Sequence, residues 1–468
     1  MLLYGTNKYI ISRDRHPGLW NYFHSNAMLS KNLKNAAIFR IRQCFTAHGK
    51  EKLTANEQEV MNEISLTCSV TGLKAPKSVM TYKFLDKLMR VTDNPDFFAG
   101  LPMQSAQQIL KNACNDFKGW ISALKSCKKN PAAFTGKPKM PGYIKSDEVT
   151  AIFTNQDCVI YSDGDGTSHL KLPLTKEVLR LGLFPEAVTL REVKAVPYYG
   201  GYEVILSYLY ETEEPDPGSM PYIAAIDLGL DNIAAIVSNS GSPGCIYKGG
   251  AVKACNQWFN KRMSGLRGVQ MKGHDPKTYH LPQTKAMMSL SRHRDCFMHD
   301  FFHKTSSDII KRLIRWRCGI LVVGINKGQK QHSGIGHVNN QSFASVPFFT
   351  FRQMLKYLCE RNGIMYVERE ESYTSKASLI DGDYIPTFGV DDDRASFSGA
   401  RIKRGLYRTK DNIIVNADLN GAGNILRKEY PDAFNGIADI RGLISAPVVV
   451  RFHDLYLKRN PAKRIAAA

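Results

Sequence analysis

Two short apolar runs near the middle of the chain, 223–226 and 233–237, are separated by the polar segment DLGLDN. Runs this short, with Gly229 to allow a turn, predict two consecutive strands. After them come a long helical stretch at 285–317, a strand GILVVG, a helix around 347–362, a strand IMYVE and a last helix in NADLNGAGNILRK. This order of strands and helices is that of an RNase H-like layer.

The first half of the chain has different periodicities. Residues 20–65 are typical of helices, and apolar residues at three- and four-residue spacing between positions 105 and 124 predict a helix that packs into a core. From 148 to 210 the pattern alternates, which predicts a small barrel-like β region with a hairpin turn at Gly200-Gly201. The acidic, proline-rich residues 211–221 predict a linker.

These patterns together predict an α+β multidomain protein. Its expected parts are a helical region with part of the β domain, a β-rich region with the linker, and an RNase H-like α/β domain that carries an irregular insertion. In residue numbers they are 1–147, 148–220, 221–468 and, for the insertion, 372–411.

The charge is strongly positive and unevenly spread. The formal net charge is +20, and Lys+Arg against Asp+Glu is 22 to 11 for residues 1–150, 5 to 11 for 151–220 and 36 to 21 for 221–468. Two basic regions therefore flank an acidic connector. Such a distribution favours a polyanionic partner, of which nucleic acid is the commonest, over a surface that is merely solubilising.

Cysteine usage and hydropathy narrow the class of protein further. The ten cysteines include no CxxC pair, and none follows Cys359. This predicts reduced thiols rather than a disulfide framework or a zinc ribbon. There is no apolar run of about 18 residues, and the N-terminal segment is charged too early for a secretory signal. We therefore expect a cytoplasmic protein without a membrane-spanning segment.

Two carboxylates are placed where an RNase H-like sheet brings its acids together. Asp227 ends the first strand, and Asp418 opens the last helix. Metal-dependent phosphodiester hydrolysis needs hard oxygen ligands from distant chain positions that converge on one or two Mg²⁺ ions. A simpler interpretation of Asp418 is a helix N-cap, because Asn416 and Asp418 both precede a helical run.

The third acid is missing from its expected place. The strand GILVVG ends at Gly324, which offers no oxygen, whereas the next strand carries Glu368, Glu370 and Glu371. Adjacent strands lie about 4.8 Å apart, so a glutamate there could reach the space that Gly324 leaves. If Ile364 and Tyr366 face one side of the sheet, odd-numbered positions face the other, which separates Glu371 from Glu370 without showing which side holds metal.

Several motifs together resemble the TnpB proteins of insertion sequences. They are AIDLGLDNIAAI, VVGINKGQKQ, NNQSFASVPFFTFRQML, EESYTSKASLIDGD, FSGARIKRGLYRTKDN and NADLNGAGNILRK, with LPMQSAQQILKNACNDFKGW and FTGKPKMPGY in the first half. The resemblance covers roughly residues 75–430. It is closest to the branch whose second motif ends in glycine and whose EESYTSK strand is rich in glutamate.

TnpB proteins and the compact type V CRISPR effectors descended from them are RNA-guided DNA endonucleases with one RuvC-type site. The resemblance implies that Asp227 and Asp418 are the first and third acids of that site. For the relocated acid we choose Glu371, with Glu370 as the alternative. It also implies that two Mg²⁺ ions are bound, that the first half includes a wedge domain, and that a guide RNA and double-stranded target DNA are the partners.

The chain departs from the common family pattern in the insertion. Many TnpB proteins have a four-cysteine zinc ribbon after TSxxC, whereas this sequence reads TSKAS with Ala377 and no later cysteine. We therefore expect no structural zinc, and a segment 376–411 that is ordered by other means or acts as a lid.

Basic residues in three segments are candidates for nucleic-acid binding. Lysines alternate with Pro, Gly and aromatic residues in 125–145, which suits phosphate contacts and base stacking, although a solvated basic loop explains them equally well. The candidates are Lys125, Lys128, Lys129, Lys137, Lys139, Lys145, Lys327, Lys330, Arg401, Lys403, Arg404 and Arg408.

Three functions stay in competition at this point. The first is an RNA-guided, Mg²⁺-dependent DNA endonuclease, associated with the bacterial nucleoid when bound to DNA. The second is a nuclease-inactive relative that binds DNA under RNA guidance and represses transcription, which Gly324 keeps open. A guide-independent transposase ranks last. The sequence does not indicate the guide type, transposon-derived or CRISPR, or whether one or two copies bind each RNA.

Overall fold

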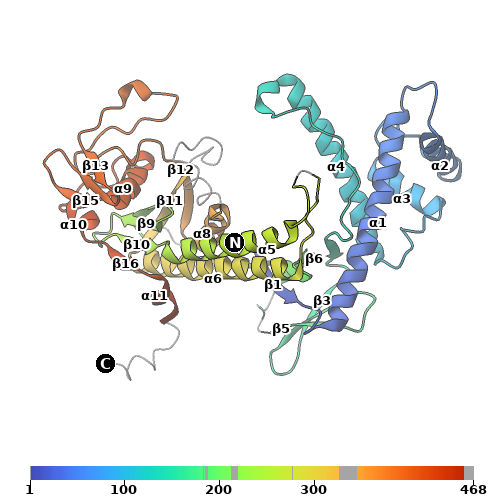
Figure 1. Ribbon diagram of the computed structural model, residues 1–468, viewed down its shortest axis with the longest axis horizontal. Coiled ribbons are helices and arrows are strands. Elements are labelled where there is room, and N and C mark those ends of the chain that lie inside the picture. The colour runs from blue at the N-terminus through green and yellow to red at the C-terminus, as the bar shows by residue number, and fades with distance from the viewer. Residues whose placement is uncertain are drawn as a thin grey trace. The chain divides into compact units, whose positions relative to one another are not determined.

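The computed structural model describes residues 2–182, 184, 188–211, 220–276, 278–325 and 345–457. The chain forms two compact units, residues 1–212 and 213–468 (Figure 1). Most of the predicted linker lies outside the described residues. Within the described ranges, no helix has both the length and the apolar character needed to cross a lipid bilayer.

The helices of the first unit share one apolar core. They are α1 (Pro17–Ala47), α2 (Ala55–Thr71), α3 (Tyr82–Val91) and α4 (Met103–Lys129). Helix α2 begins at a reciprocal cap, in which Thr54 accepts from the backbone of Glu57 and Glu57 accepts from the backbone of Thr54. The apolar stripe predicted for 105–124 is buried at Ile109, Ala113 and Phe117, which confirms its role in packing.

Two antiparallel sheets complete the first unit. One has the order β1-β7-β6-β2, built from β1 (Leu2–Ile11), β2 (Ala151–Thr154), β6 (Thr189–Tyr198) and β7 (Gly201–Glu211). The other consists of β3 (Val159–Ser162), β4 (Ser168–Lys171) and β5 (Val178–Gly182). The β6–β7 turn is formed by Tyr199 and Gly200, both at positive φ, one residue earlier than predicted.

The second unit contains a six-stranded sheet in the order β12-β11-β8-β9-β10-β16. Its strands are β8 (Tyr222–Asp227), β9 (Asn232–Ser238), β10 (Cys245–Lys248), β11 (Cys318–Ile325), β12 (Met365–Glu370) and β16 (Val448–Val450). Strands β8, β9 and β10 are antiparallel, whereas β11 is parallel to both β8 and β12. This confirms the predicted RNase H-like order, to which β16 adds a parallel edge strand.

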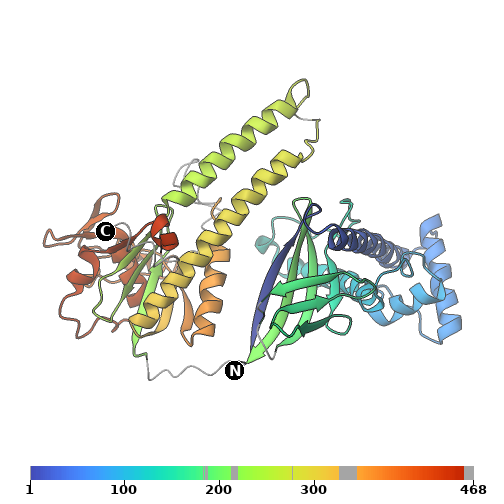
Figure 2. The same cartoon turned by 90° about the horizontal axis from the view of Figure 1, so that it is seen from below.

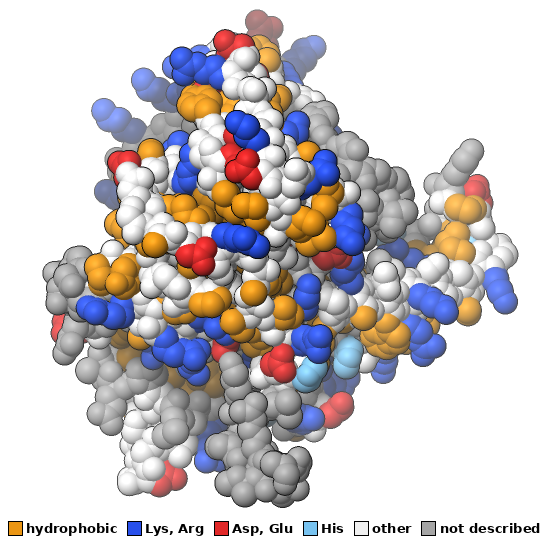
Figure 3. Space-filling model, turned by 90° about the vertical axis from the view of Figure 1, so that its left-hand side faces the viewer, with side chains coloured by type: hydrophobic (Ala, Val, Ile, Leu, Met, Phe, Trp, Pro, Cys, Tyr) orange, Lys and Arg blue, Asp and Glu red, His pale blue; other side chains and the backbone are white. Residues whose placement is uncertain are grey.

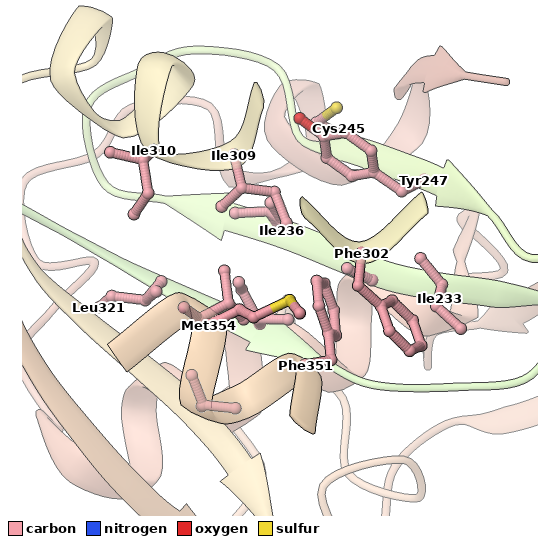
Figure 4. Packing of buried hydrophobic residues seen from close by; sticks show 14 of the residues in the cluster. Ile233, Ile236, Cys245, Tyr247, Phe302, Ile309, Ile310, Leu321, Phe351 and Met354 are labelled. Atoms are coloured by element: carbon pink, nitrogen blue, oxygen red, sulfur yellow. The ribbon is translucent and has the colours of Figure 1, made fainter. Parts of the chain in front are cut away.

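The two faces of this sheet have separate cores. Ala224 and Ile226 pack with helices α6 (Lys285–Arg315) and α8 (Phe348–Arg361), and Figure 4 shows part of this cluster. Ala225, between them, packs with α9 (Ala417–Glu429) and α10 (Ile440–Ser445) on the other face. Because side chains alternate along a strand, Asp227 shares the α9 face with Ala225.

Helix α5 (Gly250–Met271) lies beside the first half of α6 and forms a two-helix arm with it. Figure 2 shows this yellow-green and yellow pair extending away from the sheet. The arm has a small core of its own, in which Met263, Met287 and Leu290 are buried. The second unit ends with α11 (Phe452–Leu457), whose Phe452 packs on the α6 side.

Candidate active site

Asp227 ends β8 directly against helix α9. A Cβ added at Gly421 of α9 would lie 2.9 Å from Asp227 Oδ2, closer than real Cβ contacts allow. Glycine at this position therefore lets the helix approach the carboxylate at the strand end.

Asp418 lies in the first turn of α9 and is not its N-cap. The cap is Asn416, whose Oδ1 accepts from the backbone N–H groups of Asp418 at 3.1 Å and Leu419 at 3.0 Å. The simpler interpretation of Asp418 is therefore wrong, because the neighbouring amide already caps the helix. The carboxylate instead accepts from Arg401 at Oδ1, at 3.0 Å, and from Asn232 at Oδ2, at 2.5 Å.

Glu371 follows the end of β12 and occupies the space in front of Gly324. Its backbone N–H donates to the carbonyl of Ile325 at 3.1 Å, which extends the β11–β12 pairing by one step. A Cβ added at Gly324 would lie 2.7 Å from Glu371 Oε2 and 2.5 Å from Ile425 Cδ1 of α9. The space that an acidic side chain at position 324 would need is therefore taken by Glu371 and α9.

The structure shows which face of the sheet the residues of β12 point to, which the alternation of side chains along the strand did not determine. Ile364 and Tyr366 pack with the α6–α8 core, while Val367 packs with the α9 core. Odd-numbered positions of β12 therefore face α9, on the same side as Asp227. Glu371 follows this strand, and its Oε2 lies on the α9 side because it and Ile425 Cδ1 of α9 both lie within 3 Å of a Cβ added at Gly324.

Glu370 has different partners. It accepts from Lys428 Nζ at 2.7 Å and from the backbone N–H and hydroxyl of Ser372 at 2.6 and 2.8 Å. Burial alone would raise the pKa of Glu370, but these hydrogen bonds outweigh it and lower the pKa. Lys428 is itself almost fully buried, with 3% of its side chain exposed, so Glu370 neutralises a buried cation.

Burial and neighbouring charges raise the pKa values of Asp227 and Glu371. Burial raises the pKa of Asp227 well above its usual range, and the charges of Glu371 and Asp418 raise it further while Arg401 opposes them. Burial, and after it the charge of Glu370, raises the pKa of Glu371 to about 7. A bound cation would stabilise the charged form of carboxylates placed in this way, because it offsets both the cost of burial and their mutual repulsion.

The donor set fits a divalent ion such as Mg²⁺, which prefers carboxylate oxygens. As they stand, the described residues contain no group of three or more acidic, histidine or cysteine side chains arranged to hold a metal ion. The carboxylate of Asp418 is turned toward Arg401 and Asn232 instead.

A pocket of about 450 Å³ opens at this place. Asp227 and Asp418 line it, and Glu371 is not part of its lining. Its other lining residues are Gly229, Leu230, Asp231, Asn232, Lys248, Arg401, Arg404 and Gly405. Asp231 forms ion pairs with Lys253 and Arg404 at its rim.

Asn232 and Lys248 were not predicted from the sequence. Lys248 Nζ donates to Asn232 Oδ1 at 2.9 Å, so the amide NH₂ group is directed at Asp418 Oδ2. Asn232 is 8% exposed and begins β9, a strand that is buried throughout. The sequence signal that could have identified Asn232 is its position as a polar residue at the start of an otherwise apolar strand.

The two other asparagines of NADLNGAGN hold the inserted segment. Asn420 donates to the carbonyl of Ala377 at 2.7 Å and accepts from the backbone of Leu379 at 2.9 Å. Asn424 donates to the carbonyls of Thr374 at 3.0 Å and Ala377 at 2.6 Å. Both amides are fully buried, so they anchor residues 374–379 to α9.

Carboxylates order the insertion further along. Asp383 Oδ2 accepts from the backbone of Ser378 at 2.8 Å and of Ser398 at 3.0 Å. Asp381 Oδ2 accepts from the Ser398 hydroxyl at 2.8 Å and the Lys410 backbone at 3.0 Å. The segment ends in a three-stranded sheet of β13 (Ala400–Lys403), β14 (Leu406–Arg408) and β15 (Ile414–Asn416).

The basic candidates lie on exposed surface wherever they are described. In the first unit they are Lys125, Lys128 and Lys129 at the end of α4, and Lys137, Lys139 and Lys145 in the irregular stretch after it. In the second unit they are Arg401, Lys403, Arg404 and Arg408, on β13, β14 and the turn between them, whereas Lys327 and Lys330 lie outside the described residues. Figure 3 shows Lys and Arg side chains spread over one face of the molecule.

Two segments, which lie mainly in the second unit, match models of known protein families. Residues 207–329 match the family model OrfB_IS605, a probable transposase, and residues 348–425 match the Cas12f1-like TNB domain. No curated protein matches the chain in sequence.

Solved structures resemble the chain over most of its length. A Cas12f1–sgRNA–target DNA complex is 14% identical, with 88% of this chain and 84% of that one covered and a TM-score of 0.51. C2c1 of Alicyclobacillus acidoterrestris with single-guide RNA is 8% identical, with coverages of 91% and 88% and a TM-score of 0.43. The mini-RNA-guided endonuclease CRISPR-Cas_phi3 is 9% identical, with coverages of 91% and 92% and a TM-score of 0.38.

The strand order and the helices that cover the sheet define a protein with an RNase H-like domain. Its two matched regions make the chain similar to the OrfB_IS605 transposase family over residues 207–329 and to the Cas12f1-like TNB domain over 348–425. This confirms the resemblance that the sequence motifs indicated, and the Cas12f1 structure confirms the α+β multidomain fold.

Proposed function

We propose that this chain is an RNA-guided DNA endonuclease that hydrolyses phosphodiester bonds at a single RuvC-type site. The solved Cas12f1 structure of similar fold holds a single-guide RNA and target DNA. The basic surface of this chain, with a net charge of +20, suits the same partners. Sequence choice would come from base pairing with the guide, while the protein reads a short flanking DNA motif.

The observation that carries the proposal is the position of Glu371. Its carboxylate lies where a Cβ at Gly324 would be 2.7 Å away, and its charge raises the pKa of Asp227. A domain that had lost its acid at 324 without compensation would retain two acids, Asp227 and Asp418. The third carboxylate on the same side of the sheet therefore favours the nuclease over the nuclease-inactive repressor.

Each residue of the site has a distinct proposed role. Asp227, Glu371 and Asp418 would hold two divalent ions, which we propose are Mg²⁺. Such ions, when bound, neutralise the charge that develops on the phosphate and make water nucleophilic near neutral pH. Asn232 holds one oxygen of Asp418, and Arg401 on the other oxygen is positioned to meet a phosphate that enters the pocket.

The test is cleavage by the purified chain together with the RNA that copurifies with it. Target DNA that matches this RNA should be cut in Mg²⁺ and left intact in EDTA. Asp227→Ala should abolish cutting and leave RNA-dependent DNA binding unchanged. Loss of both activities together would argue against the assigned role of Asp227, and binding without cutting in the unmodified chain would favour the repressor.

Sequencing the copurified RNA addresses the biological source of the guide. A CRISPR repeat and a transposon-end transcript are distinct sequences, and each would identify the guide type. RNA without a region that pairs with DNA would contradict the proposed guidance.

A further inference from the structure

The α5–α6 arm carries an exposed tryptophan that its own packing does not use. The small core of the arm consists of Met263, Met287 and Leu290, with Phe259, Leu266 and Leu281 packed against it. Trp258 is outside this cluster, is 46% exposed and contacts His293 of α6 edge to face, with ring centroids 5.6 Å apart. A large aromatic side chain left in solvent in this way commonly marks a binding surface.

Trp258 and His293 line a pocket of about 670 Å³ between the two helices. This volume is in the range of small-molecule sites. Its apolar lining residues include Leu266, Val269 and Leu290, and its basic lining residues are Lys261 and Arg262. None of the described residues that line the pocket is acidic.

The charge of the arm indicates what kind of ligand it would accept. Between residues 250 and 294 the sequence has nine Lys and Arg residues and one acidic residue, Asp275. Among the described residues, Lys261 and Arg262 form no ion pair that would neutralise their charges. A protein partner with an apolar surface would leave this charge uncompensated, whereas a polyanion would compensate it.

We propose that the pocket between α5 and α6 binds an unpaired nucleotide of a nucleic-acid strand. The base would stack on Trp258, and Lys261 and Arg262 would contact the flanking phosphates. An aromatic ring beside two cations is the arrangement with which proteins hold single strands without reading their sequence. A paired base in a duplex does not expose its face in this way, so the pocket selects unpaired strands.

This inference rests on the proposed function only in that nucleic acid is the partner. It does not require Asp227, Glu371 or Asp418, so binding can be measured in EDTA, where no cleavage takes place. If the pocket does not bind single strands, the cleavage test is still valid. If the chain does not cleave DNA, the binding test is still valid.

The experiment uses the full chain and fluorescence anisotropy with labelled homopyrimidine oligonucleotides, as RNA, as DNA and as a DNA duplex. Trp258→Ala should weaken binding of the unpaired strand by roughly fivefold to a hundredfold, the range for loss of one stacked base, and leave duplex binding unchanged. Trp258→Phe should retain most of the affinity. Replacing Lys261 and Arg262 by Gln should reduce the salt dependence of binding, which Trp258→Ala should not change.

The matched control is Phe349→Ala, which removes another exposed aromatic side chain of the same unit, 64% exposed, outside the pocket. It should bind both single strands as the unmodified chain does. If only the RNA or only the DNA oligonucleotide responds to Trp258→Ala, that strand is the ligand. Unchanged single-strand binding by Trp258→Ala, or an equal loss for the duplex, would overturn the proposal.

Discussion

Gly324 and Glu371 occupy one space between β11, β12 and α9. A Cβ at position 324 would lie 2.7 Å from Glu371 Oε2, so the glycine at the end of one strand and the glutamate at the end of its neighbour depend on each other. Under the proposed function, Glu371 supplies the acid that Gly324 lacks, and it can do so only because position 324 has no side chain.

Gly324→Ala should disturb the site more than an ordinary glycine substitution. The added Cβ meets Glu371 Oε2 and Ile425 Cδ1, and Ile425 is fully buried, so we expect a stability loss of about 1–3 kcal/mol and impaired cleavage. Gly268→Ala is the matched control, because nothing lies within 4 Å of a Cβ added there in α5. It should stabilise the protein by about 0.5–1 kcal/mol. Urea unfolding measures the stability of the two variants, and a cleavage assay measures their activity. Equal effects of Gly324→Ala and Gly268→Ala would contradict the argument.

Glu371→Gln and Glu370→Gln should have different consequences. Loss of the Glu371 charge should reduce cleavage about a hundredfold or more, because several kcal/mol of charge stabilisation is at stake and each ~1.4 kcal/mol is tenfold. Glu370→Gln should mainly lower the melting temperature, because it weakens the partner of the buried Lys428. Single-turnover cleavage rates and thermal melts separate the two, and the reverse pattern would make Glu370 the functional acid.

Placing an acid at position 324 in a chain that lacks Glu371 tests directly whether Glu371 replaces the missing acid. In Glu371→Ala the carboxylate in front of Gly324 is removed and only Ile425 must shift to admit a side chain, so Gly324→Asp in that background should restore part of the lost cleavage. Gly324→Asp in the unmodified chain should instead clash with Glu371 and reduce both stability and cleavage. Equal behaviour of Gly324→Asp in the two backgrounds would show that the two positions do not share one space.

Asn232→Ala should weaken divalent-ion binding by about tenfold to a hundredfold, the range for residues that orient a ligand. Lys248→Met should act in the same direction, because Lys248 fixes the orientation of the Asn232 amide. Asn239→Ala is the control, since Asn239 bonds only backbone groups of Ile223 and Ala433 in the contacts described. Calorimetric titration with Mg²⁺ measures the affinities, and an equal loss in the control would indicate a general packing role.

Folding stability should fall as pH rises through the range from about 4.5 to 7. The pKa of Glu371 is raised from 4.5 to about 7, so the folded state holds a proton that the unfolded state has released. This contribution is present below pH 4.5 and lost above 7, and Asp227 acts in the same direction. Glu371→Gln should flatten the profile in urea melts at a series of pH values. A stability that rises through this range because of Glu371 would contradict the shift.

Features of the fold and the site could be predicted from the sequence where they depend on neighbouring residues, and could not where they depend on residues far apart in the chain. The RNase H-like order, Asp227 and Asp418 follow from local patterns, since apolar runs and strand ends are visible in the chain itself. The roles of Asn420 and Asn424 could not be predicted in this way, because their partners in 374–379 lie more than 40 residues away in the sequence. Polarity on a helix looks the same whether it faces solvent or a buried backbone.

The sequence alone determined which residue types were available: an acid at the end of the first strand, a glycine at the end of the next, glutamates one strand further and no cysteine after Cys359. Only the tertiary structure decided which glutamate faces the other acids. The period of a strand separates Glu370 from Glu371 but does not say which face carries the site. The packing of α9 against Asp227, Gly324 and Glu371 defines that face.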